Sequence, residues 1–261
     1  MKIAMTDMDI IWEDKVANKE QCLLMIAEAA EKKAGLILFP EMTLTGFSMA
    51  VEKVCDKADE TILFFSEQAR RYHLAIGFGY VTVNVDGKGQ NHFCIVDVEG
   101  KQIMDYIKIH PFTYGGEATC YEGGNRIVSF SIGDFTCGAF ICYDLRFPEA
   151  FQQLPVDTDA IFIIANWPEV RLSHWYTLLQ ARAIEMQCYV VGVNRTGEGG
   201  GLIYSKSSAA FDADGCRLPE ESGERNRYVI IDQTKRRAFA EKFPVRPDRR
   251  MEIYLNSLSS E

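Results

Sequence analysis

A glutamate, a lysine and a cysteine each stand directly after an apolar run of this 261-residue sequence. Glu41 follows LILFP, Lys108 follows QIMDYI, and Cys142 follows CGAFI. A free thiol, with a pKa of about 8.5, is mostly protonated at neutral pH and needs a neighbouring base before it can attack a carbonyl carbon. A carboxylate in a dry pocket can take the proton, and an ammonium can stabilise the oxyanion that then forms. The three side chains together predict a cysteine-dependent attack on a carbonyl carbon that bears nitrogen.

The first half of the chain supplies the strands that end at Glu41 and Lys108. KIAMTDM is expected to form a strand, and a helix follows from Asp14 because apolar residues recur there at helical spacing. GLILFPE (35–41) has the length of a short buried strand that Pro40 stops. After a second helix near 60–72, strands are expected at LAIGFGYV, NHFCIVDV and KQIMDYIKI. The stretch HPFTYGGEATCYEGGN that follows them is expected to be mostly irregular.

The second half repeats this plan. RIVSFSI and FTCGAFICY predict two strands joined at Gly133-Asp134, and a helix is expected after Arg146. The apolar strand DAIFIIANWP (159–168) corresponds to GLILFPE, which suggests two similar α/β halves. A helix near 171–187, the strand CYVVGVN, the turn GEGGG, two more strands and the strand RYVIID complete the pattern. Buried strands interleaved with helices predict sheets that are covered on their faces, with sites at the carboxyl ends of strands.

Composition narrows the classes of function. The net charge is −9, from 28 Lys and Arg against 37 Asp and Glu, so a nucleic-acid partner is not expected. No signal peptide opens the chain and no apolar run reaches the ~18 residues that a membrane span needs, so we expect a cytoplasmic protein without a membrane partner. The 8 cysteines are scattered and form no CxxC pair, which indicates neither a disulfide framework nor a structural metal site.

With these motifs in place, the sequence resembles the nitrilase (carbon–nitrogen hydrolase) superfamily. The Glu-Lys-Cys triad of that family matches FPEMTLTGF with Glu41, YIKIHPF with Lys108 and ICYDLRFPE with Cys142. YGGEATCYEGGN places Glu117 where the family has a second glutamate in the catalytic site. The resemblance covers nearly the whole chain. It implies one domain over 1–261, an α/β fold arranged as a four-layer α-β-β-α sandwich, and a homodimer paired through its outer helices.

The resemblance also implies a role for each site residue. Cys142, at a strand-to-helix elbow, attacks the amide carbonyl while Glu41 takes its proton and then gives one to departing ammonia. Lys108 and the backbone N–H of Tyr143 hold the oxyanion. Water cleaves the resulting thioester with Glu41 as base, and Glu117 orients the substrate and the lysine. This chemistry requires no metal and no organic cofactor.

Three further stretches, CYDLRFPE, ANWPEVRLSHW and AEKFPVRPD, are most similar to bacterial omega-amidases. The implied substrate is a small amide such as 2-oxoglutaramate or 2-oxosuccinamate, whose far carboxylate needs cationic or N–H partners. Arg146 and Arg171 are the candidates for that contact. Asn166 and Trp167, at the end of the second apolar strand, are expected to form the pocket wall opposite Cys142.

Other interpretations stay open. The substrate could be another small amide or an N-carbamoyl amino acid, because SKSS stands where relatives often have Gly-His-Ser, with Ser208 at the serine position. A Cys-His pair is a second possibility, and His110 lies two residues past Lys108. A binding module without activity is a third, although that reading requires a broken triad and every position here is filled.

Overall fold

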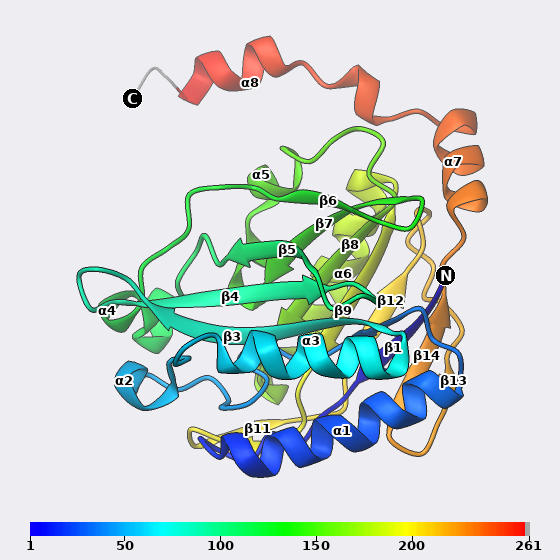
Figure 1. Cartoon of the computed structure of the whole chain (residues 1–261). Helices are drawn as coiled ribbons and strands as arrows, with labels where there is room; N and C mark the ends of the chain where they lie inside the picture. The colour runs from blue at the N-terminus through cyan, green and yellow to red at the C-terminus, as the bar shows by residue number, and fades with distance from the viewer. Residues whose placement is uncertain (259–261) are drawn as a thin grey trace.

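Two β-sheets lie at the centre of the protein, for which a computed structural model describes residues 1–258 (Figure 1). Within these residues the larger sheet has 7 strands in the order β13-β14-β1-β2-β3-β4-β5. Their bounds are β1 Lys2–Thr6, β2 Leu36–Leu38, β3 Ala75–Val83, β4 Gly89–Val96, β5 Gln102–Ile107, β13 Glu221–Ser222 and β14 Asn226–Ile230. The expected domain of 1–261 includes 259–261, which lie outside the described residues.

The smaller sheet has 5 strands in the order β12-β9-β8-β7-β6, counted over the same part of the chain. Their bounds are β6 Ser129–Ile132, β7 Phe135–Ile141, β8 Ala160–Ala165, β9 Tyr189–Asn194 and β12 Ala209–Phe211. Strands β7, β8 and β9 run parallel, as do β1, β2 and β3 of the larger sheet. The expected correspondence of the two apolar stretches is confirmed, because β2 and β8 are the middle strands of these two parallel sets.

Helices cover the outer face of each sheet. The larger sheet carries α1 (Lys15–Glu31) and α3 (Glu60–Tyr72), whose buried apolar side chains form one cluster with its strands. The smaller sheet carries α6 (Leu172–Met186), which buries Trp175, Leu179 and Ala183 against it. The inner faces of the two sheets share a core that includes Leu38 and Phe162. The expected four-layer α-β-β-α sandwich is therefore confirmed.

Local capping explains where the first helix begins. The Asp14 carboxylate accepts a hydrogen bond from the Ala17 amide at 3.0 Å, which satisfies one of the free N–H groups of the first turn. The apolar residues that follow at helical spacing, Cys22, Met25, Ile26 and Ala29, are buried against the sheet. Sequence and structure thus agree on this element.

Short elements account for the differences from the sequence-based expectations. The irregular stretch after β5 contains one turn of helix, α4 (Glu117–Cys120), and the helix expected after Arg146 is only α5 (Pro148–Phe151). A further short helix, α2 (Val51–Val54), was not expected. The GEGGG turn is partly strand, because β10 (Gly197–Gly199) pairs with β11 (Leu202–Tyr204). Gly200 and Gly201 have φ values of 57° and 76°, which this two-residue hairpin loop requires.

The C-terminal segment leaves the sandwich. After α7 (Gln233–Lys242) the chain passes the residues that precede β8 and β9, where Gln187 donates to the Phe243 carbonyl, and continues to α8 (Met251–Leu258). Helix α8 lies apart from the two sheets in Figure 1. Neither helix was predicted from the sequence. No helix in the described part of the chain has the length and apolar character needed to cross a membrane.

Candidate active site

Glu41 lies in the loop that follows β2, with its side chain fully buried. Its Oε1 accepts hydrogen bonds from Asn91 Nδ2 at 2.8 Å and from Lys108 Nζ at 2.9 Å. The loop turns sharply, because Met42 has a φ of 48°. It also packs directly on β3, where a Cβ on Gly79 would overlap the Met42 amide nitrogen. The glycine is therefore needed for the close approach that fixes the Glu41 backbone.

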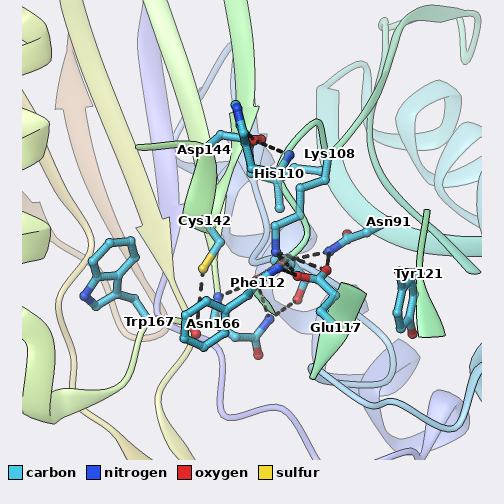
Figure 2. Close-up of polar contacts among 12 residues, drawn as sticks. Asn91, Lys108, His110, Phe112, Glu117, Tyr121, Cys142, Asp144, Asn166 and Trp167 are labelled. Carbon is cyan, nitrogen blue, oxygen red and sulfur yellow. Dashed lines mark hydrogen bonds and ion pairs between the residues drawn. The ribbon is translucent and has the colours of Figure 1, made fainter. Parts of the chain in front are cut away.

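Lys108 follows β5, and its ammonium lies between two carboxylates. Nζ is 2.9 Å from Glu41 Oε1 and 2.8 Å from Glu117 Oε2, and all three side chains are at most 1% exposed. Glu117 begins α4, and its Oε2 also accepts a hydrogen bond from the Phe112 amide at 2.5 Å. The side chains of Lys108, Glu117 and Asn91 converge in Figure 2. Two buried carboxylates thus share one cation.

Cys142 stands at the elbow between β7 and a 3-10 turn over Cys142–Arg146, as expected. Its φ of 44° is unfavourable for a residue with a Cβ, so the surrounding structure must hold it. The buried Asp144 carboxylate does this, since it accepts hydrogen bonds from the Ile141 amide at 3.1 Å and the Tyr106 hydroxyl at 2.8 Å. The Cys142 Sγ contacts the Asn166 carbonyl oxygen at 3.9 Å (Figure 2). Among the described contacts, no hydrogen bond joins Sγ to Glu41.

Burial and mutual charge set the protonation of these groups. Burial raises the pKa of the Cys142 thiol well above its usual range, and the Glu41 carboxylate adds to this effect while Lys108 opposes it. Burial also raises the pKa of Glu117, against the attraction of Lys108. For Lys108, burial acts to lower the pKa, but the charges of Glu117 and Glu41 outweigh it and raise the pKa. At neutral pH the site therefore holds a protonated thiol beside an ammonium.

A pocket opens above Cys142. Its lining includes every expected substrate-binding residue and two of the four proposed catalytic ones: Tyr143, Asn166, Trp167, Arg146, Arg171, Cys142 and Lys108. Glu41 and Glu117 lie beneath Lys108 and do not line it. Tyr204, from the β10–β11 ribbon, was not expected and lines the pocket at 4% exposure. No Asp or Glu is among the lining residues of the described chain, so the charged side chains of the lining, Lys108, Arg146 and Arg171, are all cationic.

The two arginines at this pocket are held by aromatic rings. The Arg146 guanidinium lies 4.8 Å from the centroid of the Trp167 ring, and that of Arg171 lies 5.6 Å from the centroid of Phe112. Neither has a salt-bridge partner among the described residues. Arg146 also contacts His174 Nδ1 through one terminal nitrogen at 3.3 Å. Cation–π packing fixes a guanidinium while leaving its other N–H groups available to an anion.

Asn91, Asp144 and Tyr204 are the polar residues of the site that were missed from the sequence. Asn91, in β4, bonds both buried carboxylates, Asp144 holds the elbow, and Tyr204 lines the pocket. Asp144 stands two residues after Cys142, which is a usable signal for a residue that supports a tight turn. Asn91 and Tyr204 gave no such signal, because their partners are distant in sequence.

The histidines do not support a Cys-His pair. His110 Nδ1 lies 2.8 Å from Asp144 Oδ1, and its ring stacks on Phe147. His92 contacts Asp105 and Thr82. No histidine in the described residues hydrogen-bonds Cys142. The same part of the chain contains no group of three or more His, Cys, Asp or Glu side chains arranged to hold a metal ion.

Ser208, which stands at the serine position of the Gly-His-Ser pattern, lies outside the pocket lining. It is buried between the sheets, where its hydroxyl donates to the Thr6 carbonyl at 3.1 Å and accepts from the Asn194 amide at 3.0 Å. The departing positions, Lys206 and Ser207, are also absent from the lining, and the Ser207 hydroxyl accepts from Asn194 Nδ2 at 2.9 Å. The departure therefore leaves the pocket wall unchanged.

Comparison with known proteins places this fold and pocket among the hydrolases. The chain belongs to the carbon-nitrogen hydrolase family, whose model matches residues 2–240. Omega-amidase YafV of Yersinia enterocolitica is 31% identical over 247 residues, which are 94% of this chain and 94% of that protein. The 2-oxoglutaramate amidase of Bacillus subtilis (strain 168) is 31% identical over 233 residues, 87% of this chain and 89% of that enzyme. The protein is therefore a hydrolase that acts on amides.

Solved structures agree with the fold. XC1258 from Xanthomonas campestris, a CN-hydrolase superfamily protein with an arsenic adduct in its active site, superposes with a TM-score of 0.88 at 28% identity, over 95% of this chain and 97% of that one. The NitN amidase, at 21% identity and a TM-score of 0.84 over 98% of this chain and 99% of that one, shares the fold.

Proposed function

We propose that the protein is a cysteine-dependent amidase that removes the terminal amide of a small dicarboxylate monoamide, such as 2-oxoglutaramate or 2-oxosuccinamate. One observation carries this proposal. Cys142 and the Glu41–Lys108–Glu117 cluster lie at the base of a pocket that also holds two arginines without a carboxylate partner in the described chain. The names of the omega-amidase and 2-oxoglutaramate amidase relatives support the same class of substrate.

The first half of the reaction forms an acyl-enzyme. Cys142 Sγ attacks the amide carbon as its proton passes to Glu41, and the carbonyl oxygen becomes an oxyanion. Lys108 Nζ and the backbone N–H of Tyr143 stabilise that oxyanion. When the tetrahedral intermediate collapses, the C–N bond breaks, Glu41 returns the proton to nitrogen, and ammonia leaves a thioester on Cys142.

The second half releases the acid. Glu41 takes a proton from water, the hydroxide adds to the thioester carbon, and the C–S bond breaks as the thiol regains a proton. Glu117 holds the Lys108 ammonium toward the reacting oxygen throughout. The raised pKa of the Cys142 thiol supports this order, because the proton must be removed during attack rather than beforehand.

The pocket charge supports the choice of an anionic substrate. Arg146 and Arg171 line the pocket without a carboxylate partner in the described chain, and a far carboxylate can accept hydrogen bonds from both. Amides without that carboxylate, and N-carbamoyl amino acids in which the spacing differs, are the alternatives to be excluded.

Ammonia release tests the proposal. The wild type and Cys142→Ala are compared on 2-oxoglutaramate, succinamate, glutamine, N-carbamoyl-β-alanine and a simple nitrile. We expect turnover of the keto or succinyl amides that is abolished in the variant, with an unchanged circular dichroism spectrum. Cys137→Ala is the matched control, because Cys137 is a buried thiol of β7, the strand that precedes Cys142, and does not line the pocket. Preference for the carbamoyl compound, or substantial activity of Cys142→Ala, contradicts the proposal.

We also propose that the protein forms a homodimer through its outer helices. The 50% exposure of Ile184 on α6 and of Ile253 on α8 supports an apolar contact on this side of the molecule. Sedimentation equilibrium tests this, with Ile184→Glu expected to shift the mass toward the monomer and an unchanged mass counting against the contact.

A further inference from the structure

Asn91 contacts both of the buried carboxylates in the site. It lies in β4 at 1% exposure, and its Nδ2 donates to Glu41 Oε1 at 2.8 Å and to Glu117 Oε1 at 3.1 Å. Its own backbone carbonyl accepts from the Lys108 amide at 2.8 Å. Within the described residues, Asn91 and Lys108 are the two side chains that contact both carboxylates.

One ammonium cannot offset two buried carboxylates. An ionised carboxylate without a partner is costly to bury, so the negative charge that remains persists only where hydrogen-bond donors stabilise it. Glu41 also accepts from the Asn166 amide, and Glu117 from the Phe112 amide, but each of these donors serves a single carboxylate. The Asn91 carboxamide serves both with one nitrogen and brings no charge of its own.

We propose that Asn91 is a positioning residue that holds the ionised Glu41–Glu117 pair in register with Lys108 and thereby sets the pH below which the amidase loses its base. This inference rests on the proposed role of Glu41. It goes beyond that role because it assigns the control of the pair to a residue outside the Glu-Lys-Cys triad.

The titratable and charged groups around the pair act in both directions. Those facing it from the neighbouring elements are Lys108, Cys142, Tyr121 and Tyr204. Lys108 favours the ionised pair. The thiol and the two phenols are neutral near pH 7, because burial raises the pKa of each. Lys108 is therefore the one cation in this set, and no second cation in the described chain provides the stabilisation that the Asn91 hydrogen bonds give to the two carboxylates.

Two substitutions of Asn91 distinguish a role as hydrogen-bond donor from a role in filling space. Asn91→Leu has a similar size and cannot donate, so the pair should take up a proton at higher pH. Asn91→Asp has nearly the same shape but adds a third carboxylate, which opposes ionisation of the pair further. We expect the acid limb of kcat/KM to move upward by about one pH unit in Asn91→Leu and by more in Asn91→Asp. A side chain that only fills space would give the opposite order, with the isosteric Asp variant closer to wild type.

A second readout does not depend on the substrate. The rate at which chloroacetamide alkylates Cys142, followed by mass spectrometry of the Cys142 peptide, reports the base that activates the thiol. The acid limb of this alkylation rate should move upward in Asn91→Leu and further in Asn91→Asp, as for kcat/KM. If the limb moves while no amide is hydrolysed, the positioning role stands and the proposed substrate is wrong. If amides are hydrolysed while both variants keep the wild-type limb, the positioning role is wrong and the proposed function stands.

Asn226 provides the matched control. It is also a buried asparagine of a strand in the larger sheet, with Nδ2 bonded to the Met25 carbonyl at 2.9 Å and with an unpartnered Oδ1, as in Asn91. Asn226→Leu should lower the melting temperature and leave both acid limbs in place. If Asn91→Leu does not fold, Asn91→Asp decides alone, because an unshifted limb in that variant overturns the proposal.

Discussion

The backbone amide of Asn166 donates a hydrogen bond to Glu41 Oε2 at 2.9 Å across 125 positions of sequence. The Asn166 side chain adds a second bond, from Nδ2 to the Glu41 carbonyl oxygen at 2.6 Å. These two residues follow β2 and β8, the corresponding middle strands of the two sheets. The proposed base therefore belongs to one half of the chain and is held in place by the other.

Replacing the Asn166 side chain should lower activity more than stability. Asn166→Ala keeps the backbone bond to Glu41 and loses the Nδ2 bonds to the Glu41 carbonyl oxygen and to Oε2, the latter at 3.3 Å. We therefore expect kcat/KM to fall about ten- to a hundredfold. Asn166→Asp places a like charge against Glu41 and should be worse. Steady-state kinetics on 2-oxoglutaramate checks the order of the two variants, and an Asp variant more active than the Ala variant would contradict it.

Removing the cation between the two glutamates should destabilise the fold. Lys108→Met leaves Glu41 and Glu117 buried without a counter-ion, at a cost of about 3–5 kcal/mol. The double variant Lys108→Met with Glu117→Gln removes one of the two charges and should recover part of that loss while staying inactive. Urea denaturation measures both. Equal stability of the single and double variants would mean that the two glutamates do not depend on the lysine charge.

The two arginines at the pocket should discriminate between substrates. Arg171→Met and Arg146→Met remove hydrogen-bond donors for a far carboxylate, so we expect KM for 2-oxoglutaramate to rise by about tenfold or more in each. The matched control is an uncharged amide of similar length, butyramide, whose KM should change little. A parallel rise for both amides would assign the arginines to the fold.

Buried thiols should make the protein sensitive to alkali. Burial raises the pKa of Cys188 to about 12, whereas the same thiol in the unfolded chain titrates near its ordinary value of about 8.5. A raised pKa in the folded state gives stability that is fully present below about pH 8.5 and is lost as the pH rises toward 12. Each such thiol contributes a slope of up to about 1.4 kcal/mol per pH unit in that window.

Urea midpoints between pH 7 and 10 check this expectation. Cys188→Ala should be less stable than wild type at pH 7 but should lose less stability on going to pH 10. Cys216→Ala, which removes an exposed thiol, is the control and should follow the wild-type slope. The idea fails if Cys188→Ala and the wild type lose the same stability over this range.

The sequence predicted the strands and the residues at their ends because both signals are local. An apolar run that stops at Glu41 or Cys142 is visible within ten residues, and the family motifs add Lys108 and Glu117. Asn91 was missed because it reads as an ordinary strand residue, and its importance comes from Glu41 and Glu117, 50 and 26 positions away. Tyr204 was missed for a related reason, since its short ribbon is specified by glycines that look like a loop.

The elbow at Cys142 has a consequence for the newly made chain. The proposed nucleophile is carried by the smaller sheet, while its base and cation are carried by the larger one. Until the two sheets dock, the thiol has no base beside it and the carboxylates have no thiol to activate. An immature or partly unfolded copy therefore lacks the assembled machinery and cannot turn over amides in its surroundings. Ammonia release from the amide substrate would accordingly report sheet docking during refolding.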